Sequence, residues 1–148
     1  MSFLANSLLE IKEYGEILEA ISNRKTAVNI TGPSESQKAH FCYAVLTHLG
    51  QKGIFITFNE MQARRMHEDF TFFFGDEALY FPSKEIIFHD VDAQNYDSIF
   101  QRIKVLDKIT EGKYKLVVAS AEAAAQMLLP VELFKMRCNF IAGYEDLP

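Results

Sequence analysis

The sequence predicts an α/β fold in which a parallel sheet carries helices on both faces. Short apolar runs of strand length alternate along the chain with longer segments whose apolar residues recur every three or four positions. A Gly-Pro turn also separates the first predicted strand from the helix that follows it. Strands and helices that alternate in this order form parallel sheets with helical crossovers.

The size and composition of the chain fit one compact domain. It has 148 residues, of which 49% are hydrophobic, enough to build a core. We expect this domain to span residues 1–142, and residues 143–148, which are rich in turn formers, to begin a linker to a following domain. No stretch approaches the ~20 continuous apolar residues of a membrane span, and the first residues lack the pattern of a secretory signal. The widely separated Cys42 and Cys138 fit buried thiols in a reducing cytoplasm.

Five segments have the composition of buried strands, with β-branched and aromatic residues in nearly continuous runs. They are Thr26–Thr31, Gly53–Phe58, Leu79–Phe81, Lys115–Ala119 and Cys138–Ala142. We expect Thr26–Thr31 to be central in the sheet, next to the second and fourth of these strands. Ile56 is then a core residue, and its truncation to alanine is expected to cost ~2–5 kcal/mol.

Helical spacing fills the segments between the strands. An opening helix covers 8–21 with an interruption at Gly15, and a second runs to Leu49 with Gly50 as its terminator. Asn59 is expected to cap a third helix. A fourth helix carries Tyr96 to Leu106, and a short alanine-rich one covers 121–129.

The turn after the first predicted strand is half of a phosphate-binding loop. The intact motif is Gly, four residues, Gly, Lys, and Ser or Thr. Gly32 and Lys38 occupy their positions, but Gln37 replaces the second glycine and Ala39 replaces the hydroxyl that holds Mg²⁺. A side chain at the glycine position obstructs the approach of phosphate to the backbone, and loss of the hydroxyl removes a metal ligand. We therefore expect a vestigial loop with no active cofactor site; the alternative is an ordinary strand-to-helix turn with a solvated Lys38.

The charge balance argues against a broad nucleic-acid surface. The net charge is −5, with 15 basic and 20 acidic side chains, whereas nucleic-acid affinity depends on clustered Lys and Arg. Arg64-Arg65 and the pair Lys104 and Lys108 could contact DNA locally. The plainer interpretation is a solvated helix face, with Glu68 as the expected partner of Arg64.

Other possible chemical sites are few. Asp76-Glu77 resembles the acidic pair of a magnesium site, but Gly75 before it is a natural helix terminator, so a turn is the preferred interpretation. His89, Asp90 and Asp92 cluster in a long polar connection without a second cluster to complete a metal site. His67-Glu68 lacks the second histidine of a zinc-protease helix. We therefore expect neither catalytic residues nor a metal site.

A longer succession of motifs resembles a known family. It runs through Phe81-Pro82-Ser83-Lys84-Glu85, Phe88-His89-Asp90, Gln101-Arg102-Ile103-Lys104-Val105-Leu106, the run from Lys115 to Ala123, Leu128-Leu129-Pro130 and Phe134. This succession resembles the amino-terminal region of bacterial transcription-repair coupling factor, which is similar to the amino-terminal domain of excision-nuclease component B. The resemblance implies a P-loop/helicase-like three-layer sandwich with a degenerate nucleotide site.

The resemblance also implies a function. Members of this family are ATP-driven DNA translocases that displace stalled RNA polymerase and recruit excision-nuclease component A. It implies that ATP and magnesium act in a motor outside a segment like this one, and that component A binds mainly to an adjoining domain. RNA polymerase and DNA would contact other domains of the longer protein.

Three hypotheses follow from the sequence. The leading one is a non-catalytic scaffold domain of a repair coupling factor, located in the cytoplasm. The second is a small nucleotide-binding enzyme with an unorthodox phosphate loop. The third, a DNA-contacting accessory domain, is disfavoured by the acidic charge balance.

Overall fold

The computed structural model describes residues 2–23, 27–84 and 94–137 of the chain. In chain order the elements are α1 (Ser2–Asn6), the 3₁₀ helix η1 (Ser7–Glu10), α2 (Lys12–Ser22), α3 (Glu35–Leu49), β1 (Gly53–Thr57), α4 (Glu60–Phe74), the 3₁₀ helix η2 (Gly75–Glu77), β2 (Ala78–Phe81), α5 (Gln94–Thr110), β3 (Leu116–Ser120) and α6 (Ala121–Ala125). Residues 131–137 are also helical. Among the described residues, no helix has both the length and the apolarity needed to cross a bilayer.

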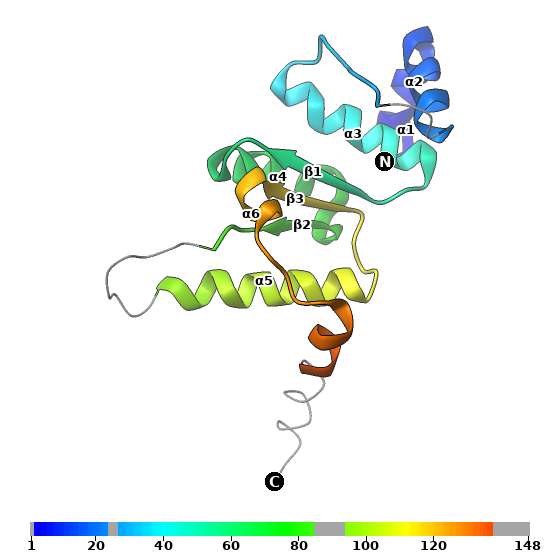
Figure 1. The fold of residues 1–148 in the computed structure, drawn as a ribbon. Helices are drawn as coiled ribbons and strands as arrows, with labels where there is room; N and C mark the ends of the chain where they lie inside the picture. Colours follow the sequence, from blue (N-terminus) through cyan, green and yellow to red (C-terminus); the bar gives the residue numbers. More distant parts are fainter. Residues whose placement is uncertain (1, 24–26, 85–93, 138–148) are drawn as a thin grey trace.

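The strands form a three-stranded parallel sheet with the order β1-β3-β2 (Figure 1). In the register, Phe55 of β1 and Tyr80 of β2 both lie beside Val118 of the central strand β3. Helix α4 connects β1 to β2, and α5 connects β2 to β3. All five residues of β3 are buried, which is typical of a parallel strand covered on both faces.

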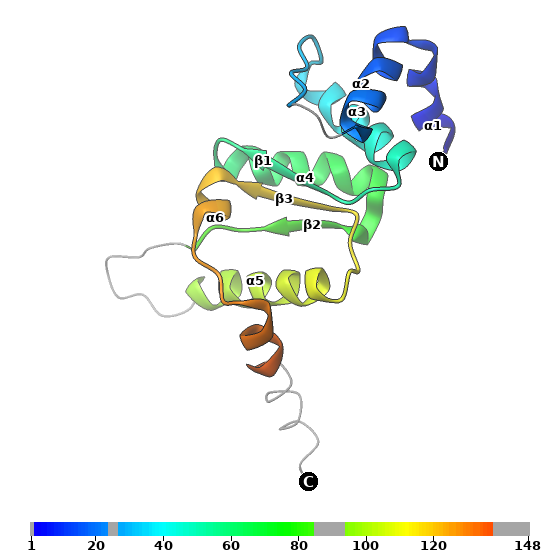
Figure 2. The ribbon, with the colours of Figure 1, turned by 45° about the vertical axis from the view of Figure 1, so that its right-hand side comes forward.

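Each face of the sheet has its own core. On one face, α3 and α4 pack on alternate strand residues, with Phe70 of α4 fully buried among Tyr80, Leu116 and Val118. On the opposite face, Val105 of α5 and an alanine of α6 pack on the intervening strand residues. Figure 2 shows α4 and α5 on opposite sides of the strands. The α/β fold with a parallel sheet and helices on both faces is therefore confirmed.

One part of the second face has no cover among the described residues. Ile54 and Ile56 of β1 are 69% and 57% exposed, because the core cluster on this face joins α5 and α6 to β2 and β3 and includes no residue of β1. The expectation that Ile56 is a core residue is wrong. It assumed that every strand of the sheet is covered on both faces, whereas β1 is an edge strand.

The amino-terminal helices pack on α3 rather than on the sheet. Ala5 and Tyr14 are buried against Tyr43, Ala44 and Val45 of α3. Together these elements form a helical layer at one end of the molecule (Figure 1).

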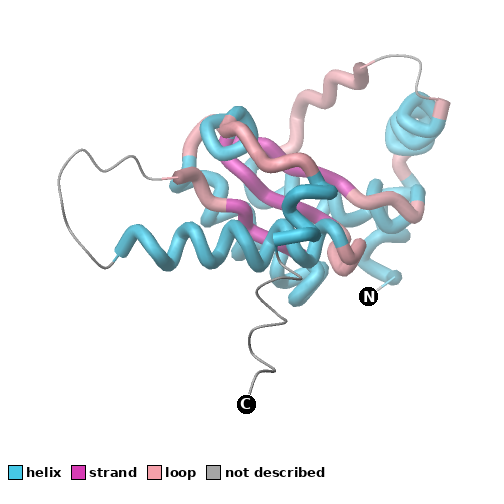
Figure 3. The backbone as a smooth tube through the Cα atoms, turned by 60° about the horizontal axis from the view of Figure 1, so that its bottom comes forward, coloured by secondary structure: helices cyan, strands magenta, loops and turns pink. Residues whose placement is uncertain are grey.

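The predicted strand Thr26–Thr31 is wrong for its described part. Residues 27–34 belong to no strand and appear as loop in Figure 3. Of residues 27–31 only Val28 is half-buried, so this β-branched run lacks the buried face and the hydrogen-bonding neighbour that a strand needs. The central strand is β3, and no phosphate-loop strand occurs in the described sheet.

The other predicted elements are present with shifted ends. The opening helix divides at Ile11, whose backbone is extended, and continues through Gly15 without a break. The alanine-rich helix ends at Ala125. Strand Cys138–Ala142 and the boundary between 1–142 and 143–148 lie outside the described residues.

Three predicted helix ends are confirmed. The Asn59 side chain accepts a 2.8 Å hydrogen bond from the Gln62 N–H at the start of α4. Gly50 ends α3 in the left-handed conformation, with φ +60°, and Gly75 ends α4 with φ +56°. Asp76 and Glu77 therefore lie in η2, the short 3₁₀ turn that follows α4, as the sequence analysis preferred.

Candidate functional site

The loop that resembles a phosphate-binding motif leads into the amino terminus of α3. Gly32 has φ +110°, a conformation that favours glycine, and turns the chain toward Ser34. Ser34 precedes the helix in extended conformation, and its N–H donates a 2.8 Å hydrogen bond to Oε1 of Gln37. This is half of a capping box, in which the third helical residue reaches back to the residue before the helix. Gln37, which replaces the motif's second glycine, is thus a capping residue.

The other two residues compared with the motif also contact the rest of the protein: Lys38 forms an ion pair and Ala39 packs in the core. Lys38 Nζ lies 3.3 Å from Oε1 of Glu35, and both side chains are about half exposed, at 44% and 51%. The Gln62 amide of α4 donates a 2.9 Å hydrogen bond to the same Glu35 oxygen. Ala39 is 1% exposed and belongs to the core between α3 and the sheet. Lys38 is therefore paired, and not simply solvated as the plainer interpretation expected.

This arrangement places a carboxylate, that of Glu35, in the first turn of α3. The amino terminus of a helix attracts anions, and here Glu35 is the anion in the first turn. It also neutralises Lys38, the side chain that would otherwise contact phosphate. A hydroxyl at position 39 would face the core instead of a metal ion, because that position is buried.

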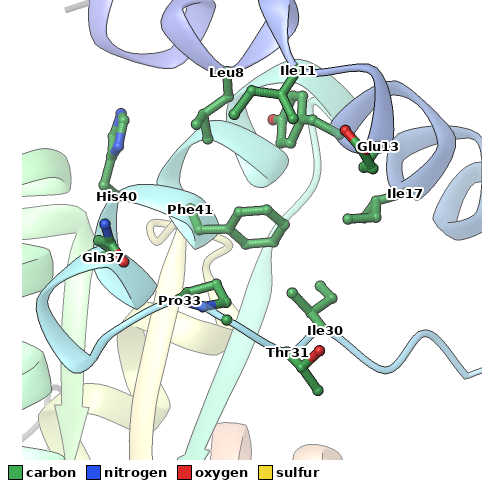
Figure 4. Close-up of a pocket in the computed structure, with 12 residues that line it drawn as sticks. Leu8, Ile11, Glu13, Ile17, Ile30, Thr31, Pro33, Gln37, His40 and Phe41 are labelled. Atoms are coloured by element: carbon green, nitrogen blue, oxygen red, sulfur yellow. The ribbon is translucent and has the colours of Figure 1, made fainter.

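A pocket lies beside this loop, between α2, residues 30–33 and the first half of α3 (Figure 4). Its volume is about 370 Å³ and its lining is mainly apolar. Figure 4 shows the Phe41 ring in the middle of the lining, with Leu8 and Ile11 on one side and Ile30 on the other.

The polar side chains around this pocket are mostly engaged within the protein. Tyr14 Oη donates a 2.8 Å hydrogen bond to His48 Nδ1, while His48 Nε2 donates to Asn6 Oδ1 at 3.3 Å. His40 Nε2 donates to the Leu4 carbonyl at 2.6 Å. Burial raises the pKa of Tyr14 to about 12, so this phenol stays protonated and neutral. Glu13 brings a negative charge to the lining, and no Lys or Arg of the described residues lines the pocket to hold a phosphate.

The remaining candidate residues that the structure describes do not form a metal site. His67 lies on α4, where its Nε2 donates to the Ala78 carbonyl at 3.1 Å. Within the described ranges no group of three His, Cys, Asp or Glu side chains could hold a metal ion. His89, Asp90 and Asp92 lie outside the described residues.

The predicted partner of Arg64 is not the one observed. Its guanidinium lies 5.6 Å from the centre of the Tyr80 ring, and no ion pair joins it to Glu68 within the described structure. Arg64 and Arg65 lie on α4, whereas Lys104 and Lys108 lie on α5, on the opposite side of the sheet. These basic residues therefore do not form one continuous surface.

A buried polar cluster at the end of β2 is absent from the sequence-based expectations. Glu60 Oε1 accepts hydrogen bonds from the Tyr80 hydroxyl and, at 3.1 Å, from the Ser83 N–H. Burial, followed by the bond to Glu60, raises the pKa of Tyr80 above its ordinary range. Arg102 of α5 donates from Nη1 to the Pro82 carbonyl at 2.5 Å. The sequence does carry one indication that Arg102 is buried: it lies on the same face of α5 as the apolar residues Ile99 and Leu106.

Comparison with known proteins gives similarity along the whole chain. No protein-family model matches it. It is 26% identical over 148 residues to the transcription-repair-coupling factor of Bacillus subtilis, covering 99% of this chain and 13% of that protein. It is 25% identical to the protein of the same name from Staphylococcus aureus strain USA300, covering 99% of this chain and 12% of that protein.

The chain thus spans about an eighth of the length of these curated relatives. The resemblance inferred from the residues is confirmed: the chain is similar to an amino-terminal region of transcription-repair-coupling factors.

Proposed function

We propose that this chain is a non-catalytic domain of a transcription-coupled DNA repair translocase. In the proposed arrangement it scaffolds the module that recruits excision-nuclease component A to stalled RNA polymerase. Component A is contacted through an adjoining domain, and RNA polymerase and DNA through other domains of the longer protein. ATP and magnesium act in the motor of that protein, in the cytoplasm, and this chain requires no cofactor of its own.

The proposal that this domain is non-catalytic is supported by the contacts of residues 35–39, whose side chains bind or pack against other residues of the same chain. Glu35 pairs with Lys38 at the amino terminus of α3, Gln37 caps the helix, and Ala39 is in the core. Binding a phosphate here would require breaking the Glu35–Lys38 pair and bringing a second anion beside the carboxylate. Support for the repair context comes from the relatives, which carry the name transcription-repair-coupling factor.

The first test measures nucleotide binding by the 148-residue chain. A ligand raises the melting temperature only by binding the native state, so Mg-ATP is expected to leave it unchanged. Glu35→Gln, which removes the competing carboxylate, serves as the comparison variant. A clear rise for the unmodified chain, with micromolar affinity, would establish instead the second hypothesis, a small nucleotide-binding enzyme.

The second test places variants in the longer protein and measures strand-specific repair in cells. Lys38→Ala is expected to leave repair intact, because this half-exposed side chain pairs, within the described residues, with Glu35 alone. Phe70→Ala, which empties a fully buried site, is expected to impair repair through loss of the folded domain. Protein levels are measured alongside. Loss of repair in Lys38→Ala at normal abundance contradicts the scaffold proposal.

A further inference from the structure

Two charged side chains bind the same peptide group where the chain leaves β2. Arg102 Nη1 donates a 2.5 Å hydrogen bond to the Pro82 carbonyl, and the Ser83 N–H donates to Glu60 Oε1 at 3.1 Å. This carbonyl and this N–H belong to one peptide unit, and in a trans peptide they point in opposite directions. Glu60 and Arg102 therefore hold the unit from its two sides.

The charges of these side chains suit the groups that they bind. The carboxylate of Glu60 meets an N–H, the positive end of the peptide dipole, and the guanidinium of Arg102 meets a carbonyl, the negative end. Both hydrogen bonds are charge-assisted, and bonds in series through one peptide polarise each other. Burial lowers the pKa of Arg102, and the charge of Glu60 opposes this effect. The two side chains thus interact electrostatically as well as through the peptide.

Within the described structure, neither charge has an ion-pair partner of its own. Arg102 is 4% exposed and lies over the Phe81 ring, with the guanidinium carbon 4.1 Å from the ring centre. Its Nη2 is buried without a hydrogen-bond partner, and so is Oε2 of Glu60. The other hydrogen bond of Glu60 comes from the neutral Tyr80 hydroxyl. A buried charge is costly unless an opposite charge compensates it, so each of these two side chains depends on the other.

The following residue, Lys84, is held by a third side chain. Gln126 Oε1 accepts from the Lys84 N–H at 2.9 Å, and Gln126 Nε2 donates to the Lys84 carbonyl at 3.5 Å. Beyond the end of β2, side chains therefore bind backbone groups that a neighbouring strand would bind inside the sheet.

We infer that Glu60, Arg102 and Gln126 form a clamp that fixes the exit of the chain from β2 and couples the two faces of the sheet. Glu60 begins α4, which covers one face. Arg102 belongs to α5, and Gln126 follows α6; both helices cover the opposite face. A change at one member of the clamp is transmitted to the others through the peptide groups of residues 82–84. This inference concerns the folded domain and does not depend on the proposed repair role.

The first experiment is a double-mutant cycle on the 148-residue chain, measured by urea denaturation. Glu60→Gln and Arg102→Lys are each expected to lower the folding equilibrium constant at least about tenfold. Because both side chains bind one peptide, the loss in the double variant is expected to be at least about threefold smaller than the product of the single losses. Glu68→Gln and Arg65→Lys make the same changes at exposed positions of α4, and less than about a twofold effect is expected for them.

The second experiment uses NMR to read each substitution at a member of the clamp that it does not touch. Glu60→Gln is expected to shift the side-chain Nε–H signal of Arg102, on the opposite face of the sheet. Gln126→Ala removes a half-buried side chain without emptying the core, and it is expected to shift that signal and the Ser83 amide signal. Gln51→Ala, at an exposed position before β1, is the control that should leave both signals in place.

Three results would overturn the inference. One is a double variant whose loss equals the product of the single losses within about twofold. Another is an Arg102 Nε–H signal that stays in place in Glu60→Gln and in Gln126→Ala. The third is an equal shift of both signals in Gln51→Ala. If Arg102→Lys does not fold, the NMR signals of the other two variants decide.

Discussion

At the scale of single residues, two positions that a phosphate-binding motif would reserve for glycine and a hydroxyl stabilise the fold of this chain instead. Gln37 closes the capping interaction with Ser34, and Ala39 fills a site with 1% exposure between α3 and the sheet. Placing the motif's residue at either position is therefore expected to disturb the cap or the packing.

The first prediction tests this by restoring the motif. Gln37→Gly removes a capping side chain and adds a helical glycine, each at a cost of ~1 kcal/mol. Ala39→Thr overfills a buried site, at a cost of ~1–3 kcal/mol. We expect the double variant to be less stable in urea denaturation and to gain no melting-temperature shift from Mg-ATP. A more stable or nucleotide-responsive double variant would contradict the structural role of these residues.

The second prediction compares two apolar side chains of similar hydrophobicity in different environments. Phe70 is fully buried and packs edge-on against Phe55, with ring centres 5.0 Å apart, so Phe70→Ala is expected to cost ~3–5 kcal/mol. Ile56→Ala is expected to change the free energy of unfolding by less than ~0.5 kcal/mol, because Ile56 is 57% exposed. Chemical denaturation of both variants measures the difference. A cost above ~2 kcal/mol for Ile56→Ala would mean that β1 is covered in solution.

Sequence reasoning failed at residues whose burial depends on distant parts of the chain. Ile56 is a large apolar residue of the kind that is usually buried. Its exposure depends on how far the helices on that face of the sheet extend toward β1. Arg102 is a charged residue of the kind that is usually exposed. It is nevertheless buried, and its Nη1 donates to the Pro82 carbonyl at the end of β2. Both outcomes are set by tertiary contacts, and the local pattern carried a signal only for Arg102, which lies on the apolar stripe of α5.

At the scale of elements, helix boundaries are fixed by a few local hydrogen bonds. The Asn59 side chain satisfies the Gln62 N–H at the start of α4, and this helix contacts both α3 and the sheet. The sequence identified Asn59, Gly50 and Gly75 as boundaries because capping depends on neighbouring residues only.

The third prediction concerns this cap. Asn59→Ala is expected to lower the free energy of unfolding by ~1 kcal/mol, because one amide at the start of α4 loses its partner. Asn59→Asp retains an acceptor oxygen and places a negative charge at the helix amino terminus, so stability should be retained. Equal losses in Asn59→Ala and Asn59→Asp, measured by denaturation, would show that the cap is not the cause.

The predicted strands that are present are those that pair with another strand of the described sheet. The runs in β1, β2 and β3 pair with one another in register, and each was recognised from its apolar composition. The run from Thr26 to Thr31 has a similar composition, but its described residues lie beside no strand. Composition alone measures the tendency to form a strand, whereas a strand exists only with a hydrogen-bonded neighbour.

At the scale of the whole molecule, stability should depend on pH at the alkaline end. Burial raises the pKa of Tyr14 from 10.0 to about 12 and that of the Cys42 thiol from 9.0 to about 11. The folded state therefore holds these two protons more tightly than the unfolded chain does.

The fourth prediction follows from the sign of this difference. At pH values more than about one unit below 9.0, both groups are protonated in either state and contribute no pH dependence. As the pH rises from 9 toward 12, the unfolded chain loses these protons first, so the free energy of unfolding falls. Urea denaturation across this range measures the fall, and Tyr14→Phe with Cys42→Ala should reduce its slope. A free energy of unfolding that stays constant or rises would contradict the assignment.

In the described sheet β1 has a neighbouring strand on one side only, so its backbone amides fall into two groups. The Gly53 N–H donates to the Lys115 carbonyl at 2.9 Å, and the two-residue period of a strand directs the Phe55 and Thr57 amides the same way. The Ile54 and Ile56 amides then point to the side where the described sheet has no further strand. Hydrogen–deuterium exchange along β1 therefore alternates between slow and fast. A polypeptide that pairs with this edge slows exchange at Ile54 and Ile56 alone, so these two amides report strand addition at single-residue resolution.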